Sequence, residues 1–119
     1  MGRVKGALGR FGEDLAVRHL ERAGLEILDR NWRCSEGEID IVARDGDTLV
    51  ICEVKTRSST RFGEPEEAVD REKAARLRRL SLRYLAERGL SWRDLSFDVV
   101  TVLRRRDADP LVRHLRSAF

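Results

Sequence analysis

The stretch EIDIVARDGDTLVICEVKTR, residues 38–57, decides the fold. Strand-like runs rich in apolar residues lie on both sides of Asp45-Gly46, which is typical of two β-strands joined by a tight turn. Primed hairpin turns need positive φ at their central residues, and Asp-Gly accepts that conformation at low cost. The sequence therefore predicts a β-hairpin with strands over residues 38–44 and 48–57.

The expected register of this hairpin gathers charged side chains on one face of the sheet. A two-residue turn predicts the pairs Arg44 with Asp47, Asp40 with Ile51, and Glu38 with Glu53. Side chains alternate between the two faces along each strand. Three carboxylates and one ammonium group then share a face: Glu38, Asp40, Glu53 and Lys55.

Carboxylates crowded on a half-buried face repel one another and raise one another's pKa. A divalent cation removes this cost, because Mg²⁺ and Mn²⁺ prefer carboxylate oxygens and water. Lys55 could then orient an attacking water or neutralise charge that develops on a phosphate. The alternative is a solvated strand face with ordinary Glu–Lys ion pairs. Pattern alone leaves both interpretations open, although helices on both sides of the sheet would argue against free solvation.

The flanking segments predict an α/β fold. We expect a helix over residues 7–23, a strand over 25–33, a helix from Pro65 to Arg88, a strand over 96–103 and an edge strand over 111–115. This order, α-β-β-β-α-β with one further strand, indicates a mixed sheet flanked by helices. The apolar side of the first helix is predicted to comprise Leu8, Phe11, Leu15, Ala16, Leu20 and Ala23.

Three polar residues fall on the apolar sides of the two helices. Glu13 is the most informative of them, because buried carboxylates are rare without a partner or an ion. For His19 a satisfied histidine at the edge of the core is the favoured interpretation. Lys73 lies in the middle of the buried arc of the second helix, where it either extends along apolar surface to solvent or reaches the carboxylates or a bound phosphate.

Length and composition favour one domain over residues 1–119, with 41% hydrophobic and 38% charged residues. We expect a cytoplasmic protein without a membrane partner, since the chain lacks a long apolar run and an apolar N-terminal segment. Cys34 and Cys52 have no metal-ligand spacing, so neither a disulfide framework nor a zinc site is expected.

Arginine dominates the basic residues, which sum to 24 with lysine against 21 acidic ones. Arginine suits phosphate recognition, although a base-composition bias or a hot habitat explains the same excess. Two segments carry the arginines that matter here: the loop around Arg57 and Arg61, and one face of the second helix. That helix face comprises Arg71, Arg76, Arg78, Arg79 and Arg83, and it fits either a nucleic-acid backbone or plain solvent.

These motifs resemble known proteins. Asp40 followed thirteen residues later by Glu53-Val54-Lys55, with Glu13 on a preceding helix, resembles the PD-(D/E)XK nuclease superfamily, whose core is α-β-β-β-α-β. The chain further resembles the YraN family of small bacterial proteins. The matching stretches are GEDLA (12–16), RNWR (30–33), GEIDIV (37–42), EVKTR (53–57) and FDVV (97–100).

The resemblance implies a restriction-endonuclease-like fold close to that of archaeal-type Holliday-junction resolvases. By that likeness the ligands of Mg²⁺ or Mn²⁺ are Asp40, Glu53, Glu13 and the main-chain carbonyl of Val54. Lys55 would assist the attacking water, and Glu38 would support the cluster. The proline of the superfamily name is absent, because Ile39 precedes Asp40.

We therefore expect a metal-dependent endonuclease that hydrolyses DNA phosphodiesters, with branched DNA as one candidate substrate. The alternatives are a catalytically silent nucleic-acid-binding accessory protein of DNA processing, and an interaction module in which the charges form a structural network. DNA is favoured over RNA, and the sequence leaves open whether the chain forms a homodimer. The expected nucleic-acid contacts are Arg57, Arg61, Lys73, Arg78 and Arg79.

Overall fold

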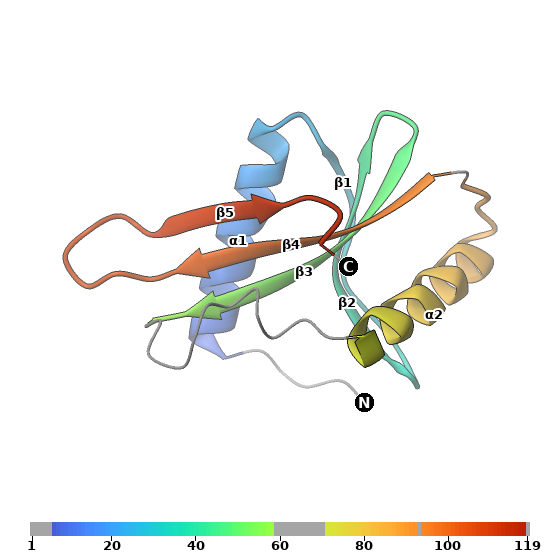
Figure 1. Ribbon diagram of the computed structural model, residues 1–119, viewed down its shortest axis with the longest axis horizontal. Helices are drawn as coiled ribbons and strands as arrows, with labels where there is room; N and C mark the ends of the chain where they lie inside the picture. The colour runs from blue at the N-terminus through green and yellow to red at the C-terminus, as the bar shows by residue number, and fades with distance from the viewer. Residues whose placement is uncertain (1–5, 59–70, 93, 119) are drawn as a thin grey trace.

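The fold is a five-stranded mixed sheet between two helices (Figure 1). It comes from a computed structural model, which describes residues 6–58, 71–92 and 94–118. The sheet has the order β1-β2-β3-β4-β5. In chain order the elements are α1 (Ala7–Arg22), β1 (Glu26–Cys34), β2 (Gly37–Asp45), β3 (Thr48–Arg57), α2 (Arg71–Arg88), β4 (Asp94–Leu103) and β5 (Leu111–Leu115).

This architecture confirms the predicted α-β-β-β-α-β order and the edge strand that follows it. The β3–β4 pair is parallel, and the other neighbouring strands are antiparallel. A parallel pair needs a crossover connection, which contains α2. The predicted start of that helix at Pro65 lies outside the described residues.

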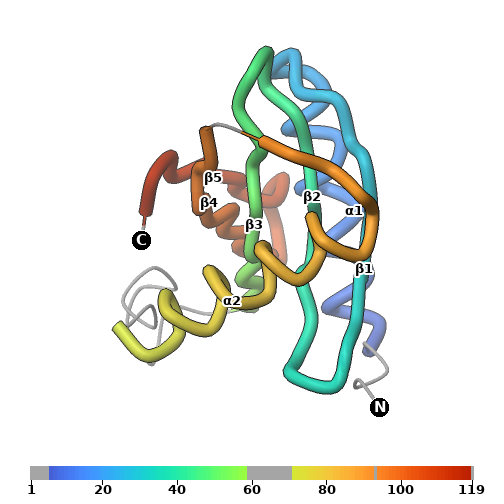
Figure 2. The backbone as a smooth tube through the Cα atoms, turned by 90° about the vertical axis from the view of Figure 1, so that its right-hand side faces the viewer, coloured from blue at the N-terminus to red at the C-terminus, as the bar shows by residue number. Residues whose placement is uncertain are grey.

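Each face of the sheet carries its own apolar core. Figure 2 shows α1 and α2 on opposite sides of the strands. On the α1 side the core includes Ala16, Leu20, Ile41, Ala43, Val50, Cys52 and Val100. On the α2 side it includes Trp32, Val42, Leu49, Ile51, Leu77, Leu80 and Tyr84. Within the described residues, neither helix is long and apolar enough to cross a membrane.

The register of the β2–β3 hairpin differs from the predicted one. Asp45 pairs with Thr48, so the two turn residues are Gly46 and Asp47, and Gly46 has φ +59°. Positive φ at the first central residue is typical of a type II′ turn, which favours Gly at that position. The predicted pairs Arg44–Asp47, Asp40–Ile51 and Glu38–Glu53 are therefore wrong. The error is two residues, an even number, so every side chain keeps its predicted face.

The contact line of α1 runs through Gly12, Ala16 and Leu20, all of which are buried. A Cβ atom added at Gly12 would lie 1.8 Å from the Thr56 Oγ1 atom, so helix and strand touch closely here. Phe11 is one residue off this line, turned by about 100°, and its side chain is 36% exposed. The prediction that Phe11 and Ala23 lie on the buried side is wrong for both residues, since Ala23 is exposed as well.

Replacing Gly12 with alanine tests this close contact. We expect Gly12→Ala to lower the free energy of unfolding by about 1–3 kcal/mol, because the new methyl group forces α1 away from β3. Chemical denaturation followed by circular dichroism measures the change. The control is Arg18→Ala, an exposed position of the same helix, where the change stays within about 0.5 kcal/mol. Equal stability of the Gly12→Ala and wild-type proteins would contradict the packing described.

A candidate metal centre and nucleic-acid interface

A pocket of about 490 Å³ opens where β2 and β3 separate. Their ladder ends at the pair Ile41–Cys52; beyond it β2 continues paired with β1, and β3 continues paired with β4. The start of α2 lies against the pocket through Lys73 and Arg76. Its charged lining residues are Glu36, Glu38, Asp40, Glu53, Lys73 and Arg76. The structure thus brings the three predicted strand carboxylates to one pocket.

The Asp40 side chain bonds to β3 at the point where the main-chain pairing of β2 and β3 ends. Its Oδ2 atom accepts a hydrogen bond from the Val54 main-chain N–H, at 2.9 Å. This contact places the Asp40 carboxylate directly beside the strand segment that carries Glu53 and Lys55. A charged acceptor makes the bond stronger than an ordinary backbone pair. The two strands can therefore diverge around the pocket while the donor group of Val54 stays satisfied.

Glu53 forms the charged centre of the pocket. Its side chain is 16% exposed, and its Oε1 atom lies 2.5 Å from Lys73 Nζ and 3.3 Å from Lys55 Nζ. The interpretation in which Lys73 reaches the carboxylates is confirmed by this contact. Among the residues that the structure describes, the Glu53 Oε2 atom is buried and has no hydrogen-bond partner. A buried carboxylate oxygen in that state is a ready ligand for a cation.

Burial lowers the pKa of Lys55 below its usual value, and the neighbouring Lys73 lowers it further. Glu53 opposes both effects through its negative charge. The Lys55 ammonium consequently gives up its proton more readily than an exposed lysine does. A lysine whose pKa is lowered suits a group that assists a water molecule.

Glu13 is buried, as predicted, but its recorded partners are on β1. Its side chain is 2% exposed, and its Oε1 atom accepts hydrogen bonds from Asn31 Nδ2 at 2.8 Å and Arg30 Nε at 3.0 Å. Asn31 has φ +53°, a left-handed conformation that Asn tolerates better than most residues. Sequence reasoning missed both partners, although each lies in the RNWR stretch.

Glu13 is not among the described residues that line the pocket. In residues 6–58, 71–92 and 94–118, no group of three or more His, Cys, Asp or Glu side chains is arranged to hold a metal ion. The carboxylates at the pocket centre are thus Asp40 and Glu53. Two carboxylates are enough for Mg²⁺, which usually keeps several waters and takes further ligands from substrate phosphates.

Of the predicted nucleic-acid residues that the structure describes, only Lys73 lines the pocket. Arg78 and Arg79 are exposed on α2, and the Arg78 guanidinium lies 5.7 Å from the centre of the Phe97 ring. Arg57 is half-buried at the end of β3. Arg61 lies outside the described residues, as does most of the loop around Arg57 and Arg61.

A second polar cluster, which sequence reasoning missed, surrounds Asp98 on β4. This fully buried carboxylate accepts hydrogen bonds from His114 Nε2 at 2.7 Å, Ser117 N–H at 3.0 Å and Ser96 Oγ at 2.5 Å. Burial raises the pKa of Asp98, but these hydrogen bonds outweigh burial and leave the pKa below its usual value. The cluster fixes β5 and the following turn to β4.

His19 packs at the edge of this cluster, with its ring centre 6.4 Å from that of His114. Burial, and then the charges of His114 and Arg22, lower the pKa of His19. The ring is half-buried between α1 and β5, as the prediction of a boundary histidine requires. His19 is not among the described residues that line the pocket.

Comparison with known proteins identifies the family. Residues 12–102 match the description "Uncharacterised protein family UPF0102". UPF0102 proteins of Frankia casuarinae, Nocardioides sp. and Acidothermus cellulolyticus are 57%, 55% and 51% identical to the chain. The aligned regions cover 98%, 96% and 95% of this chain, and 99%, 92% and 93% of the three relatives. The chain therefore belongs to the UPF0102 family, which is the YraN family of the sequence resemblance.

Removing the Lys73 charge tests the electrostatics of the pocket. We expect Lys73→Met to raise the pKa of Lys55 in metal-free protein, because one of the two causes of its lowering is gone. The value should stay below that of an exposed lysine, since burial remains. The protein has three lysines, so a ¹³Cε-lysine NMR titration resolves Lys55 directly.

The matched control is Arg79→Met, which removes one positive charge from an exposed position of the same helix. It should leave the Lys55 titration unchanged. A Lys55 pKa that is unaffected by Lys73→Met would show that the two ammonium groups do not interact.

Proposed function

We propose that this protein is a metal-dependent endonuclease that hydrolyses phosphodiesters in DNA. The observation that carries the proposal is the pocket centre, where the half-buried Glu53 carboxylate lies beside Asp40 and contacts two lysine ammonium groups. A structural ion pair needs one ammonium group per carboxylate. Glu53 contacts a second ammonium group, and its other carboxylate oxygen has no hydrogen-bond partner among the described residues. Both features favour a site that receives further charged groups.

The donor set fits Mg²⁺ or Mn²⁺. Asp40 and Glu53 supply hard carboxylate oxygens, and the Val54 carbonyl is the third protein ligand that the family resemblance implies. When bound, the ion supplies a Lewis acid that polarises the scissile phosphate and activates water. The pocket is large enough to admit water and a phosphate group beside these ligands.

The two lysines have different roles in this proposal. Lys55, with its lowered pKa, holds the attacking water and takes part in moving its proton. Lys73 comes from α2 and neutralises charge on the phosphate, because its ammonium group reaches the pocket from the side opposite to the strand carboxylates. In the absence of substrate both ammonium groups neutralise Glu53, which limits the cost of holding that carboxylate half-buried.

Nucleic acid is the substrate class that the surrounding charge favours. Arg78 and Arg79 are exposed on the helix that supplies Lys73, and Arg57 ends the strand that supplies Glu53. Arginine guanidinium groups bind phosphates through paired donors without reading sequence. Glu13 in this proposal is a positioning residue, which holds Arg30 and Asn31 on β1 behind the pocket strands.

A second candidate function is nucleic-acid binding without cleavage, in an accessory protein of DNA processing. One observation favours it: the described residues include no three-carboxylate group, so Glu13 is not placed as a third ligand beside Asp40 and Glu53. In that case the lysine pair neutralises Glu53 permanently, and the pocket binds a phosphate without cutting it.

Cleavage assays decide between the two functions. Labelled linear, flapped, single-stranded and four-way-junction DNA are incubated with Mg²⁺, Mn²⁺ or EDTA. We expect metal-dependent cleavage that falls at least about 100-fold in Glu53→Gln and Lys55→Met, because Glu53 is a proposed metal ligand and Lys55 is the proposed partner of the attacking water.

The matched control is Glu21→Gln, which removes an exposed carboxylate from α1 and should retain full activity. DNA binding without cleavage under every metal condition would overturn the nuclease and favour the accessory protein. Cleavage that survives in both site variants would show that a contaminating enzyme is responsible.

A further inference from the structure

One end of the molecule carries an aromatic and basic surface that the pocket does not use. It lies where α1 begins and where β3 and β4 end. We call it the terminal patch, and it comprises Phe11, Arg57, Arg104 and Arg106. Phe11 is 36% exposed, Arg104 and Arg106 are exposed, and Arg57 is half-buried.

Contacts join three of the four members of the terminal patch, through the main chain at Arg57 and through the side chains of Phe11 and Arg104. The Arg104 N–H donates a hydrogen bond to the Arg57 carbonyl, at 2.8 Å. The Arg104 guanidinium lies over the Phe11 ring, 5.8 Å from its centre. Phe11 itself is placed by the close contact of Gly12 with Thr56, which anchors the start of α1 to the end of β3. Phe11, Arg104 and the end of β3 therefore form a defined surface, and Arg106 adds an exposed charge in the loop that follows β4.

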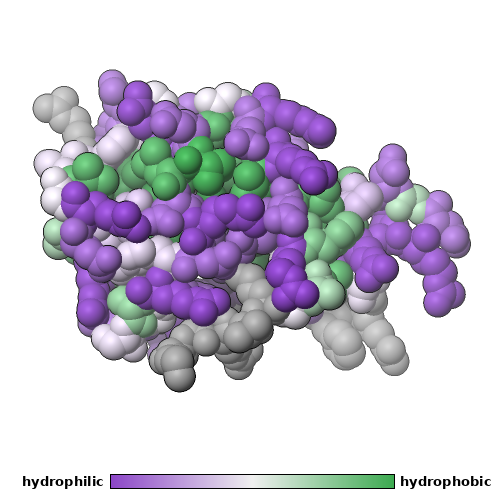
Figure 3. All heavy atoms as spheres, turned by 180° about the vertical axis from the view of Figure 1, so that it is seen from behind, coloured by the Kyte–Doolittle hydropathy of each residue, from purple (hydrophilic) through white to green (hydrophobic). Residues whose placement is uncertain are grey.

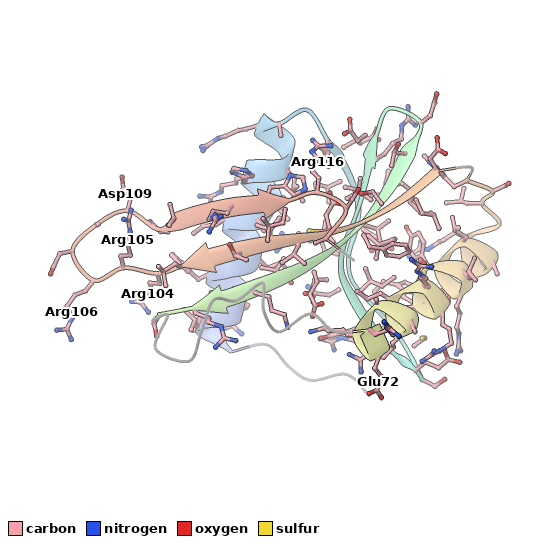
Figure 4. All side chains as sticks on the ribbon, in the orientation of Figure 1. Glu72, Arg104, Arg105, Arg106, Asp109 and Arg116 are labelled. Atoms are coloured by element: carbon pink, nitrogen blue, oxygen red, sulfur yellow. The ribbon has the colours of Figure 1, made fainter. Side chains whose placement is uncertain are left out.

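The hairpin between β4 and β5 extends this surface away from the sheet. Figure 1 shows the hairpin projecting beyond the end of β3, and Figure 3 shows it from behind as a hydrophilic arm. The Arg105 Nε atom donates to the Asp109 carbonyl at 2.7 Å, which braces the loop. In Figure 4, Arg104 and Arg106 point to the side where β3 ends, whereas Asp109 points to the opposite side. The Asp109 side chain is therefore turned away from these two arginines.

An exposed phenylalanine beside arginines fits unpaired nucleotides better than duplex DNA. Every base has a flat face that stacks on an aromatic ring or on a guanidinium plane, and such stacking is tolerant of sequence. Arginines supply the accompanying phosphate contacts. In a duplex the bases are already stacked on one another, so Phe11 would have no face to bind.

The strand register fixes the distance between Arg57 in the patch and Glu53 in the pocket. Glu53 pairs with Val99, and Arg57 pairs with Leu103, so the patch begins four strand residues beyond Glu53. At about 3.3 Å per residue this is about 13 Å. A strand that leaves the pocket along β3 therefore reaches Arg57 within a few nucleotides.

We infer that the terminal patch binds the unpaired continuation of the strand whose phosphate lies in the pocket, with a base stacked on Phe11. This inference rests on the proposed function and specifies its substrate class. The favoured substrate is DNA with a single-stranded segment next to a duplex, such as a flap, rather than an uninterrupted duplex.

Binding measurements without cleavage test the inference. Fluorescence anisotropy gives the Kd of a flapped duplex and of the same duplex without the flap, in Ca²⁺, for wild type, Phe11→Ala and Arg104→Ala/Arg106→Ala. We expect Phe11→Ala to raise the Kd for the flapped DNA about tenfold and to leave the Kd for the plain duplex within about twofold of the wild-type value. The double arginine variant should weaken flapped DNA and reduce the slope of log Kd against log salt by about two.

Two further variants make the result decisive. Phe11→Leu keeps an apolar side chain without a ring, and it should lose as much flap binding as Phe11→Ala even if the alanine variant is less stable. Arg22→Ala/Arg44→Ala removes the same charge from exposed positions at the other end of α1 and on β2, and it should change flap binding less than twofold.

The outcomes separate this inference from the nuclease proposal. Equal affinity for flapped and plain duplex, unchanged by both Phe11 variants, would overturn the inference while the Glu53 and Lys55 cleavage results still stand. An equal loss in the matched arginine control would overturn it as well, because charge alone would then explain the binding. Wild type that binds no DNA in any metal would overturn both.

Discussion

The hydrogen bond from the Val54 main-chain N–H to the Asp40 carboxylate is the contact on which the pocket depends. It replaces the next rung of the β2–β3 ladder, which ends at Ile41 and Cys52. A buried N–H without a partner costs about 1–3 kcal/mol, so strands cannot diverge inside a covered sheet unless a side chain takes over the bond. Asp40 takes it over and brings its charge to the same place. The divergence then gives Glu53 room to face a pocket instead of a neighbouring strand, and Lys55 contacts Glu53 there.

The charged groups in this pocket neutralise one another. Glu53 lies half-buried, and two ammonium groups share its Oε1 atom, while burial and Lys73 lower the pKa of Lys55. Removing one member of such a group leaves the others with an uncompensated charge in a poorly solvated place. An incoming cation and an incoming phosphate would satisfy the carboxylates and the lysines at the same time. We therefore expect metal and nucleic acid to support each other's binding, which a purely structural ion pair would not show.

The elements and their faces could be predicted from sequence, but the exact partners could not. The alternation in residues 38–57 was sufficient to gather Glu38, Asp40 and Glu53, because a register error of two residues leaves the faces unchanged. The predicted register was wrong because Gly46 is the first central residue of the turn and not the second. Helical spacing likewise predicted that Lys73 lies on the side of α2 that faces the sheet.

The errors and omissions have long-range causes. Glu13 was predicted to be buried, yet its partners depend on the left-handed Asn31 and on a register shift between Ile27 and Asp29, neither of which has a clear local signal. The Asp98–His114 bond joins residues sixteen positions apart across an edge strand whose pairing the sequence leaves uncertain. Phe11 was assigned to the core because helical periodicity does not show that the narrow contact line follows Gly12.

Crystals soaked in Mn²⁺ test the central claim most directly, since anomalous scattering locates the ion independently of any activity. The account predicts a peak coordinated by Asp40 and Glu53, with the Lys73 ammonium withdrawn from Glu53 to make room for it. A pocket without a peak, in which both lysines still contact Glu53 at saturating Mn²⁺, would show that the carboxylates form a closed ion-pair network and not a metal centre.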